Sequence, residues 1–177
     1  DIESGVIGTV GLGAIEDASD DTGVSRKVFI VHGHDEQLRF QVSEFVTSLG
    51  LEPVVLANEP NLGRTIIEKF EGESQVGYAV ILATPDDVAF LSSTFDDAES
   101  IDDLGDPEHR ARQNVIFEWG YFAGTLGRQG VALVYQEPVR LPGDLQGLVY
   151  FGYKESFEEV QWKLVREFKA AGLPVKI

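Results

Sequence analysis

The sequence predicts an α/β fold: one doubly wound domain built on a parallel sheet of five strands. Five short apolar segments, typical of strands buried on both faces, alternate with stretches whose apolar residues recur at helical spacing. Crossovers between parallel strands are right-handed, so helices should cover both faces of the sheet. The predicted strands are 28–31, 53–56, 78–82, 131–135 and 148–151.

The connections between these strands carry helix and loop signals. Apolar residues at helical spacing predict a helix over 38–49, which Gly50 ends. A capping box at Thr65–Glu68 predicts the start of a short helix after the second strand, and one at Ser156–Glu159 predicts the start of the last helix. Residues 89–109 carry seven acidic side chains and neither Lys nor Arg, which predicts a solvated loop.

Residues 110–128 are predicted to form the helix around which the domain is organised. Its large apolar side chains form one seam: Val115, Trp119, Phe122 and Leu126. A second face is made mostly of small residues, including Gly120 and Gly127. Glycine inside a helix costs up to about 1 kcal/mol relative to alanine, so this face should pack closely against another element. The helix is therefore expected to be buried on two sides.

Glu118 lies beside the apolar seam of this helix, between Phe117 and Trp119. Its position predicts a half-desolvated carboxyl group, and such groups gather at functional sites. We therefore interpret Glu118 as a candidate functional acid. The alternative is an ordinary solvated carboxylate on a helix surface.

Length and composition fit one domain with an appendage. The chain has 177 residues, 43% of them hydrophobic, which suffices for one ordinary core. We divide it into a connector over 1–26 and a domain over 27–177. The connector mixes glycine with apolar residues, so we expect it to dock on the domain or on a neighbour. The chain begins at Asp1 and contains no methionine, which predicts a fragment of a longer protein.

The net charge of −16 opposes nucleic acid or an anionic membrane as the main partner, because like charges repel and no long basic run compensates. No apolar run approaches the roughly 18 residues of a membrane span, and no signal peptide is visible. The absence of cysteine excludes disulfides and thiolate metal sites. These features predict a cytoplasmic protein.

Polar and glycine-containing segments follow the predicted strands. Because the carboxyl ends of parallel strands meet at one edge, we expect these segments to gather there: 32–36, 57–65, 84–87 and 135–147. In the first of them, Gly33 permits a close approach of the backbone to a ligand. The side chains of His32, His34 and Asp35 are candidate metal ligands, but a glycine turn with Asp35 as helix cap is the favoured interpretation.

Two other segments at this edge offer ligand-binding chemistry. Gly63 and Arg64 combine a glycine bend, a cation and a helix start, which suits a phosphate or pyrophosphate. The sequence is not a P-loop, because the Gly-Lys-Ser/Thr ending is missing. Thr84 and Asp86 form either a turn and cap or contacts to a ribose or ring.

Four motifs, in this order, resemble the bacterial TIR-like domain family. They are Val31-His-Gly-His-Asp35, Gly63-Arg-Thr-Ile-Ile-Glu-Lys-Phe70, Leu82-Ala-Thr-Pro-Asp-Asp87, and Arg110-Ala-Arg-Gln-Asn-Val-Ile-Phe-Glu-Trp-Gly-Tyr-Phe122 with Leu126-Gly-Arg128. The similarity runs from about Lys27 to Phe151, and four ordered motifs are far more specific than any one alone. The resemblance implies the TIR fold, which is a flavodoxin-like sheet of five parallel strands.

The resemblance also implies an activity: an NAD⁺ glycohydrolase effector of anti-phage defence (abortive infection), activated when its TIR domains assemble into a homo-oligomer. Such domains are fused to STING or other modules that sense a cyclic nucleotide, and here that module would be the missing one. The family's catalytic glutamate falls on Glu118. NAD⁺ is the substrate, and neither a metal nor another cofactor is implied.

The resemblance places further residues around the substrate. Arg64 or Arg112 would face the pyrophosphate, and Asn114 would orient the acid. The complete set of implied binding residues is His32, Gly33, Asp35, Gly63, Arg64, Thr84, Asp86, Arg112 and Asn114. Cleavage of the bond between nicotinamide and ribose passes through an oxocarbenium-like transition state, so one carboxylate near the sugar is the main requirement. The product, linear or cyclic ADP-ribose, stays open.

Two rival interpretations remain at this stage. A non-catalytic TIR-type interaction module would share the fold, with Glu118 merely structural. A phospho-receiver domain is suggested by Asp35, Asp86 and Asp87 near strand ends and by Lys154 after the fifth strand, although two histidines and a glycine interrupt the acidic cluster that a receiver needs.

Overall fold

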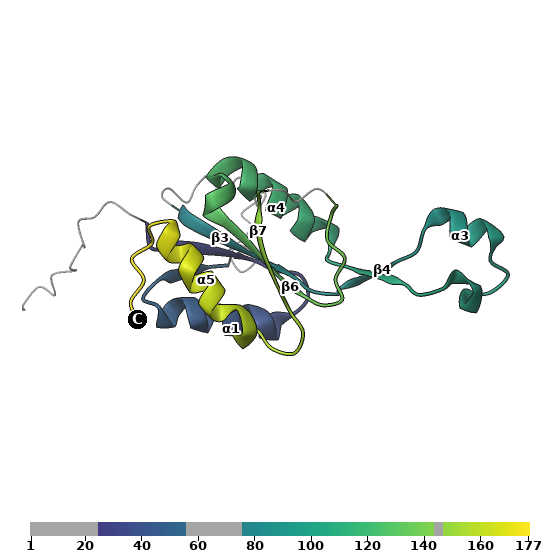
Figure 1. The fold of residues 1–177 in the computed structure, drawn as a ribbon, viewed down its shortest axis with the longest axis horizontal. Helices are drawn as coiled ribbons and strands as arrows, with labels where there is room; N and C mark the ends of the chain where they lie inside the picture. The colour runs from purple at the N-terminus through teal and green to yellow at the C-terminus, as the bar shows by residue number, and fades with distance from the viewer. Residues whose placement is uncertain (1–24, 56–75, 144–146) are drawn as a thin grey trace, which may run out of the picture.

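A computed structural model describes residues 25–55, 76–143 and 147–177, and Figure 1 shows its fold. Several predictions fall outside these residues. They include nearly all of the connector, the binding residues Gly63 and Arg64, and the capping box at Thr65–Glu68.

The central sheet has five strands, all parallel, which confirms the predicted fold class. The strands are β1 (Lys27–Val31), β2 (Glu52–Val54), β3 (Val76–Ala83), β6 (Val131–Gln136) and β7 (Val149–Tyr153). They lie in the order β2-β1-β3-β6-β7, which is the flavodoxin-like order. The chain changes direction across the sheet between β1 and β3, and ligands of such sheets bind beyond the carboxyl ends of the strands at this point.

Helices cover both faces of the sheet (Figure 1). Helices α1 (Glu36–Ser48) and α5 (Glu158–Ala170) pack on one face, where the ring of Tyr78 meets Phe168 edge-on at 5.1 Å between centroids. Helix α4 (Gln113–Leu126) packs on the other face, where Phe122 lies 5.5 Å from Phe29. None of the helices in the described part of the chain is long and apolar enough to cross a membrane.

Helix α4 differs from its prediction in two ways. It begins at Gln113 rather than at Arg110, which belongs to a strand. It ends at Leu126, because the next residue, Gly127, has a φ of 77° that is unfavourable for other residues. The apolar seam is buried as predicted, but the small-residue face is not. Gly120 is exposed, and a Cβ added to Gly120 or Gly127 would meet no atom within 4 Å. The expectation that another element packs closely on this face is therefore wrong for the single chain.

Most described side chains of the predicted solvated loop at 89–109 are exposed, as predicted, but the segment contains strands and helices, which corrects the prediction of a loop. Strands β4 (Asp87–Ala89) and β5 (Glu108–Arg110) pair antiparallel, and between them lie α3 (Ser92–Asp97) and the 3₁₀ helix η2 (Ile101–Leu104). A capping box between Ser100 and Asp103 begins η2. Together, residues 87–110 form an arm that projects from the domain (Figure 1). The pairing joins residues far apart in sequence, so local composition did not reveal it.

Candidate functional site

A cavity of about 330 Å³ lies beyond the carboxyl end of β1, against the first turns of α4. Its polar lining comes from the segment after β1, the first residue of α1 and the start of α4: His32, Gly33, His34, Glu36, Arg112, Asn114 and Glu118. The cavity is therefore at the point where the strand order reverses, and it brings together five of the predicted site residues.

Glu118 is the acid of this cavity. It lies one residue before Trp119, which is buried against the sheet, and its own side chain is half-buried at the edge of the same seam. Burial raises the pKa of Glu118 from its ordinary value of 4.5 to about 7. The prediction of a partly desolvated carboxyl group is confirmed.

His32 presents a hydrogen-bond acceptor that the protein does not use. Its Nδ1 lies 2.9 Å from the carbonyl oxygen of Gly33 and must donate to it, which leaves Nε2 as the acceptor in the neutral ring. Among the described residues, Nε2 is buried and has no partner. The side chain is only 7% exposed, so the vacant nitrogen is shielded from solvent. A buried acceptor without a partner costs about 1–3 kcal/mol, which a ligand hydroxyl or amide would recover.

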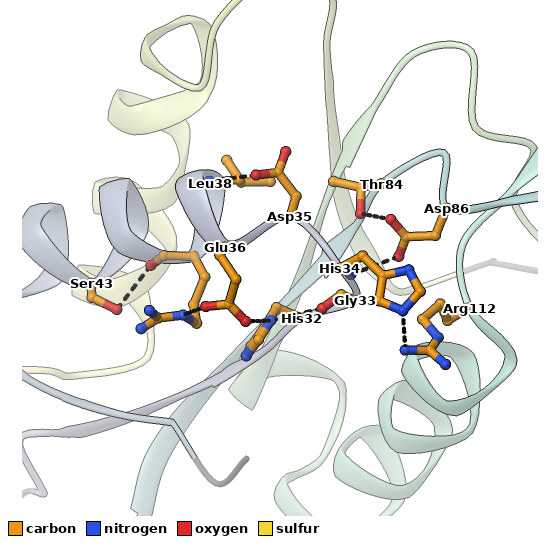
Figure 2. Close-up of polar contacts among 11 residues, drawn as sticks. His32, Gly33, His34, Asp35, Glu36, Leu38, Ser43, Thr84, Asp86 and Arg112 are labelled. Atoms are coloured by element: carbon orange, nitrogen blue, oxygen red, sulfur yellow. Dashed lines mark hydrogen bonds and ion pairs between the residues drawn. The ribbon is translucent and has the colours of Figure 1, made fainter. Parts of the chain in front are cut away.

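A chain of polar contacts joins the segments after β1 and β3 to α4 (Figure 2). The hydroxyl of Thr84 donates to Asp86 at 2.9 Å, and the other oxygen of that carboxylate accepts from the backbone N–H of His34 at 3.2 Å. Across the site, Nη1 of Arg112 donates to Nε2 of His34 at 2.6 Å. The predicted convergence of 32–36 and 84–87 at one edge is confirmed, and Arg112 is held at the rim by a neutral acceptor.

Gly33 makes the approach of Asp86 possible. A Cβ added at this position would overlap the carboxylate of Asp86, and the three nearest atoms to that Cβ all belong to Asp86. A residue without a Cβ is therefore needed at position 33 for a structural reason, because the carboxylate of Asp86 also accepts a hydrogen bond from the backbone N–H of His34.

This packing predicts a coupled effect of two substitutions. Gly33→Ala should lower the free energy of unfolding by about 1–2 kcal/mol, because Asp86 must give up its hydrogen bonds to Thr84 and His34. In an Asp86→Ala background the same change should cost little. Urea unfolding of the unchanged chain, the two single variants and the double variant measures the coupling. Equal costs of Gly33→Ala in both backgrounds would show that Asp86 is not what the glycine accommodates.

Asp35 does not line this cavity. Its carboxylate caps α1 by accepting from the backbone N–H of Leu38 at 2.8 Å, as the favoured interpretation of the turn predicted, and it borders a separate hollow that includes Tyr153. The ring of His34 contacts the guanidinium group of Arg112. Within the described ranges, no three His, Asp or Glu side chains gather closely enough to hold a metal ion.

A larger cavity of about 440 Å³ lies elsewhere on α4, against Gln113 and Ile116. It contains Glu108, whose carboxylate lies 2.7 Å from Arg110 Nη2 and 3.3 Å from Arg140 Nε. These charges satisfy one another, and Glu118 is not among its lining residues. We therefore place the candidate site in the smaller cavity, where the acid has a raised pKa.

Two polar residues that line the cavity, His34 and Glu36, are not in the set predicted from the sequence. His34 was considered only as a metal ligand. Its partner Arg112 lies in another motif, and only the fold brings the two together. Glu36 forms an ion pair with Arg39 at 2.6 Å in the first turn of α1. The two residues are three apart, which is a spacing typical of ion pairs on a helix, so the sequence itself contains the signal for this pair.

The fold and the site together define a TIR-type α/β domain with an acid at the strand-order reversal. Residues 27–155 match the model of the family described as "CAP12/Pycsar effector protein, TIR domain". The chain belongs to this family, which confirms the resemblance seen in its four motifs.

Several relatives are similar to this chain over different lengths. The chain is 43% identical over 154 residues to the uncharacterized protein YuaY of Escherichia coli K12, a match covering 85% of this chain and 47% of YuaY. It is 37% identical over 142 residues to protein tirC of Dictyostelium discoideum, covering 76% and 68% respectively. It is 35% identical over 86 residues to the Pycsar effector protein PaPycTIR of Pseudomonas aeruginosa, covering 48% and 24%. The match thus spans about half of YuaY and about a quarter of PaPycTIR.

Proposed function

We propose that this chain is an NAD⁺ glycohydrolase domain that cleaves the bond between nicotinamide and ribose as the effector of an anti-phage defence system. One observation carries the proposal: the half-buried Glu118 lies in a cavity at the strand-order reversal of a TIR domain. Loss of nicotinamide leaves positive charge on the ribose ring, and a carboxylate beside the ring stabilises that charge.

The raised pKa of Glu118 is compatible with this role. Desolvation disfavours the charged carboxylate when the cavity holds no cation. NAD⁺ carries its positive charge on the nicotinamide ring, and a cation beside Glu118 would favour the ionised form. Substrate and acid would therefore stabilise each other, most strongly as the charge moves onto the ribose. Because nicotinamide is already a cationic leaving group, no second carboxyl group is needed as general acid.

Other cavity residues would bind the rest of the substrate. The vacant Nε2 of His32 would accept a hydrogen bond from a ribose hydroxyl. Arg112 would face the diphosphate: it has no carboxylate partner in the described part of the chain, and its partner His34 is neutral when it accepts. Arg64 is the alternative for this role and lies outside the described residues. Asn114, one turn before Glu118, would orient the acid.

Regulation by assembly is the second part of the proposal. We infer that a cyclic nucleotide sensed by another domain of the full-length protein brings TIR domains together in the cytoplasm. The family description and the name of PaPycTIR support this inference. The acidity of the chain also supports it, since a net charge of −16 opposes spontaneous packing of identical domains.

The test is nicotinamide release by the chain with and without forced clustering. We expect low turnover for the isolated chain and a rise of at least about tenfold when it is fused to an inducible oligomerisation domain, which requires about 1.4 kcal/mol of bias toward the competent state. NAD⁺ loss per protomer should be followed from nanomolar to high micromolar protein. Chromatography of the same samples separates linear from cyclic ADP-ribose. A high activity that clustering does not change would refute regulation by assembly but not the chemistry.

The rival interpretations fit the structure less well. A non-catalytic TIR-type interaction module would not need a partly buried carboxyl group in a cavity, because desolvation of that group disfavours its charged form. A phospho-receiver would need its acids and lysine together. Here Asp35 caps α1, Asp86 bonds to Thr84, and Nζ of Lys154 lies 3.8 Å from Glu137.

A further inference from the structure

The arm at 87–110 exposes large apolar side chains that the rest of the domain does not cover. Ile101 is 82% exposed and Leu91 is 65% exposed, and Val88 and Phe95 are also exposed. Figure 1 shows α3 projecting away from the sheet and its helices. Single exposed apolar residues are ordinary, but several on one small projecting element mark an interaction surface.

The arm has an internal organisation of its own. The ring of Phe90 meets Phe95 edge-on at 5.8 Å between centroids, and Leu104 is buried. The carboxylate of Asp103 accepts from both the backbone N–H and the hydroxyl of Ser100 at 2.8 Å. Ile101 and Leu91 are therefore presented outward by an ordered element, which lowers the entropy cost of docking them.

The charge of the arm restricts what can cover it. Glu99, Asp102 and Asp106 are exposed, and the chain has neither Lys nor Arg between residues 87 and 109. A surface complementary to the arm must be both apolar and basic. Asp103 adds a further negative charge, since its hydrogen bonds to Ser100 hold its pKa below the ordinary value.

The C-terminal half of the outer face of α5 has these properties, whereas Glu158 and Glu159 make the first turn of this face acidic. Trp162, which is 68% exposed, lies on one face with Arg166 and Lys169, at spacings of four and three residues. The opposite face of the helix, including Leu164 and Phe168, is buried in the core. The exposed face is therefore not needed for the fold of its own chain.

The other two large helices lack this combination. Phe40 on α1 is exposed, but Glu36 and Glu44 lie one turn to either side of it, and Arg39, the one basic residue of this helix, pairs with Glu36. Phe117 on α4 is exposed, but no Lys or Arg lies between Gln113 and Leu126. An acidic arm is repelled by the first surface and gains no charge complementarity from the second.

We propose that the arm of one copy docks on the outer face of α5 in a second copy, with Leu91 and Ile101 packing on Trp162 and the arm carboxylates facing Arg166 and Lys169. In one chain the arm and the C-terminal end of α5 lie at opposite ends of the molecule (Figure 1), so the contact joins two copies. Because the two surfaces differ, a dimer leaves one free arm and one free α5 face, one on each copy, and the assembly can grow.

This proposal extends the assembly step of the proposed function by naming the contact surfaces. Disulfide trapping tests it, since the chain contains no cysteine. Ser92→Cys places a thiol beside Leu91, and Ala170→Cys places one beside Lys169; both positions are exposed, and neither side chain is used in the contact. Oxidation of a 1:1 mixture of the two variants should give a mixed disulfide dimer, and high salt should slow its formation.

In the matched controls, the thiol on α5 is replaced by a thiol on another helix. Thr47→Cys, two turns after Phe40 on α1, and Thr125→Cys, two turns after Phe117 on α4, carry exposed thiols. Each, mixed with Ser92→Cys, should crosslink at least about tenfold more slowly than Ala170→Cys does. Equal rates for all three pairs, faster trapping by Thr125→Cys or Thr47→Cys, or no trapping with Ala170→Cys would overturn the proposal.

A second measurement tests the direction of the contact. Ile101→Ser should disable only the arm and Trp162→Ser only α5, and both side chains are exposed, so folding should survive. In sedimentation experiments at millimolar protein, which matches the effective concentration of clustered domains, each variant alone should remain monomeric, whereas their 1:1 mixture should form dimers through the one intact pair of surfaces. A mixture that stays monomeric at this concentration overturns the proposal. Neither experiment uses NAD⁺, so failure here is distinguishable from failure of the proposed activity.

Discussion

Glu118→Gln is expected to lower kcat/KM for NAD⁺ cleavage by at least about a hundredfold, which is the scale of losing one group that stabilises charge in the transition state. The substitution removes the negative charge beside the ribose without changing the volume of the side chain. Nicotinamide release by clustered protein measures the loss, and circular dichroism checks the fold.

The matched control is Glu44→Gln, the same chemical change at an exposed position of α1 outside the cavity. Its activity should equal that of the unchanged chain. A folded Glu118→Gln variant with full activity would end the assignment of Glu118 as the catalytic acid. A loss in both variants would indicate that net charge, rather than the position of the acid, governs the reaction.

The same substitution is expected to stabilise the fold at neutral and alkaline pH. Each unit by which the pKa of Glu118 differs between the folded and unfolded chain is worth about 1.4 kcal/mol. Burial raises that pKa from 4.5 to about 7. The effect of Glu118→Gln on the free energy of unfolding should therefore differ between pH 4 and pH 8. Allowing for the partial exposure of the carboxyl group, the variant should gain about 2 kcal/mol over the unchanged chain between these two pH values, roughly a thirtyfold change in the folding equilibrium.

The sign follows from proton binding. Below pH 4.5 the carboxyl group is protonated in both states, and its contribution to stability is fully present. As the pH rises from 4.5 toward 7, the carboxyl group loses its proton in the unfolded chain before it does so in the folded chain, and the free energy of unfolding falls. Above pH 7 the carboxyl group is ionised in both states, and the loss of stability no longer changes with pH. Urea unfolding of both chains from pH 4 to 8 measures the difference between them. A difference that does not change with pH would show that Glu118 is not desolvated in the folded chain.

The residues of α4 show how far spacing alone predicts a site. The recurrence of Val115, Trp119 and Phe122 identified the buried face, and the position of Glu118 beside it predicted a partly buried acid. The same reasoning failed for Gly120. Periodicity reveals which side chains share a face, but not whether another element covers that face.

Long-range pairing explains the other differences. The sequence between 87 and 110 is acidic and rich in loop-forming residues, yet the antiparallel pairing of Val88 with His109 organises it as an arm. Such pairing depends on residues that meet only in the folded chain. The contact between His34 and Arg112 was missed for the same reason, because their motifs are separated by two strands of the sheet and by the arm.

The sequence by itself determined the parallel α/β class, the family and the identity of the acid, because apolar periodicity and ordered motifs are local properties of the chain. Tertiary structure alone decided which motif residues share the cavity. The cavity is lined by His32, Arg112 and Glu118, whereas Asp35 caps helix α1. The physical reason is the reversal of strand order between β1 and β3, which brings the end of β1 against the start of α4 and encloses a carboxyl group that solvent would otherwise surround.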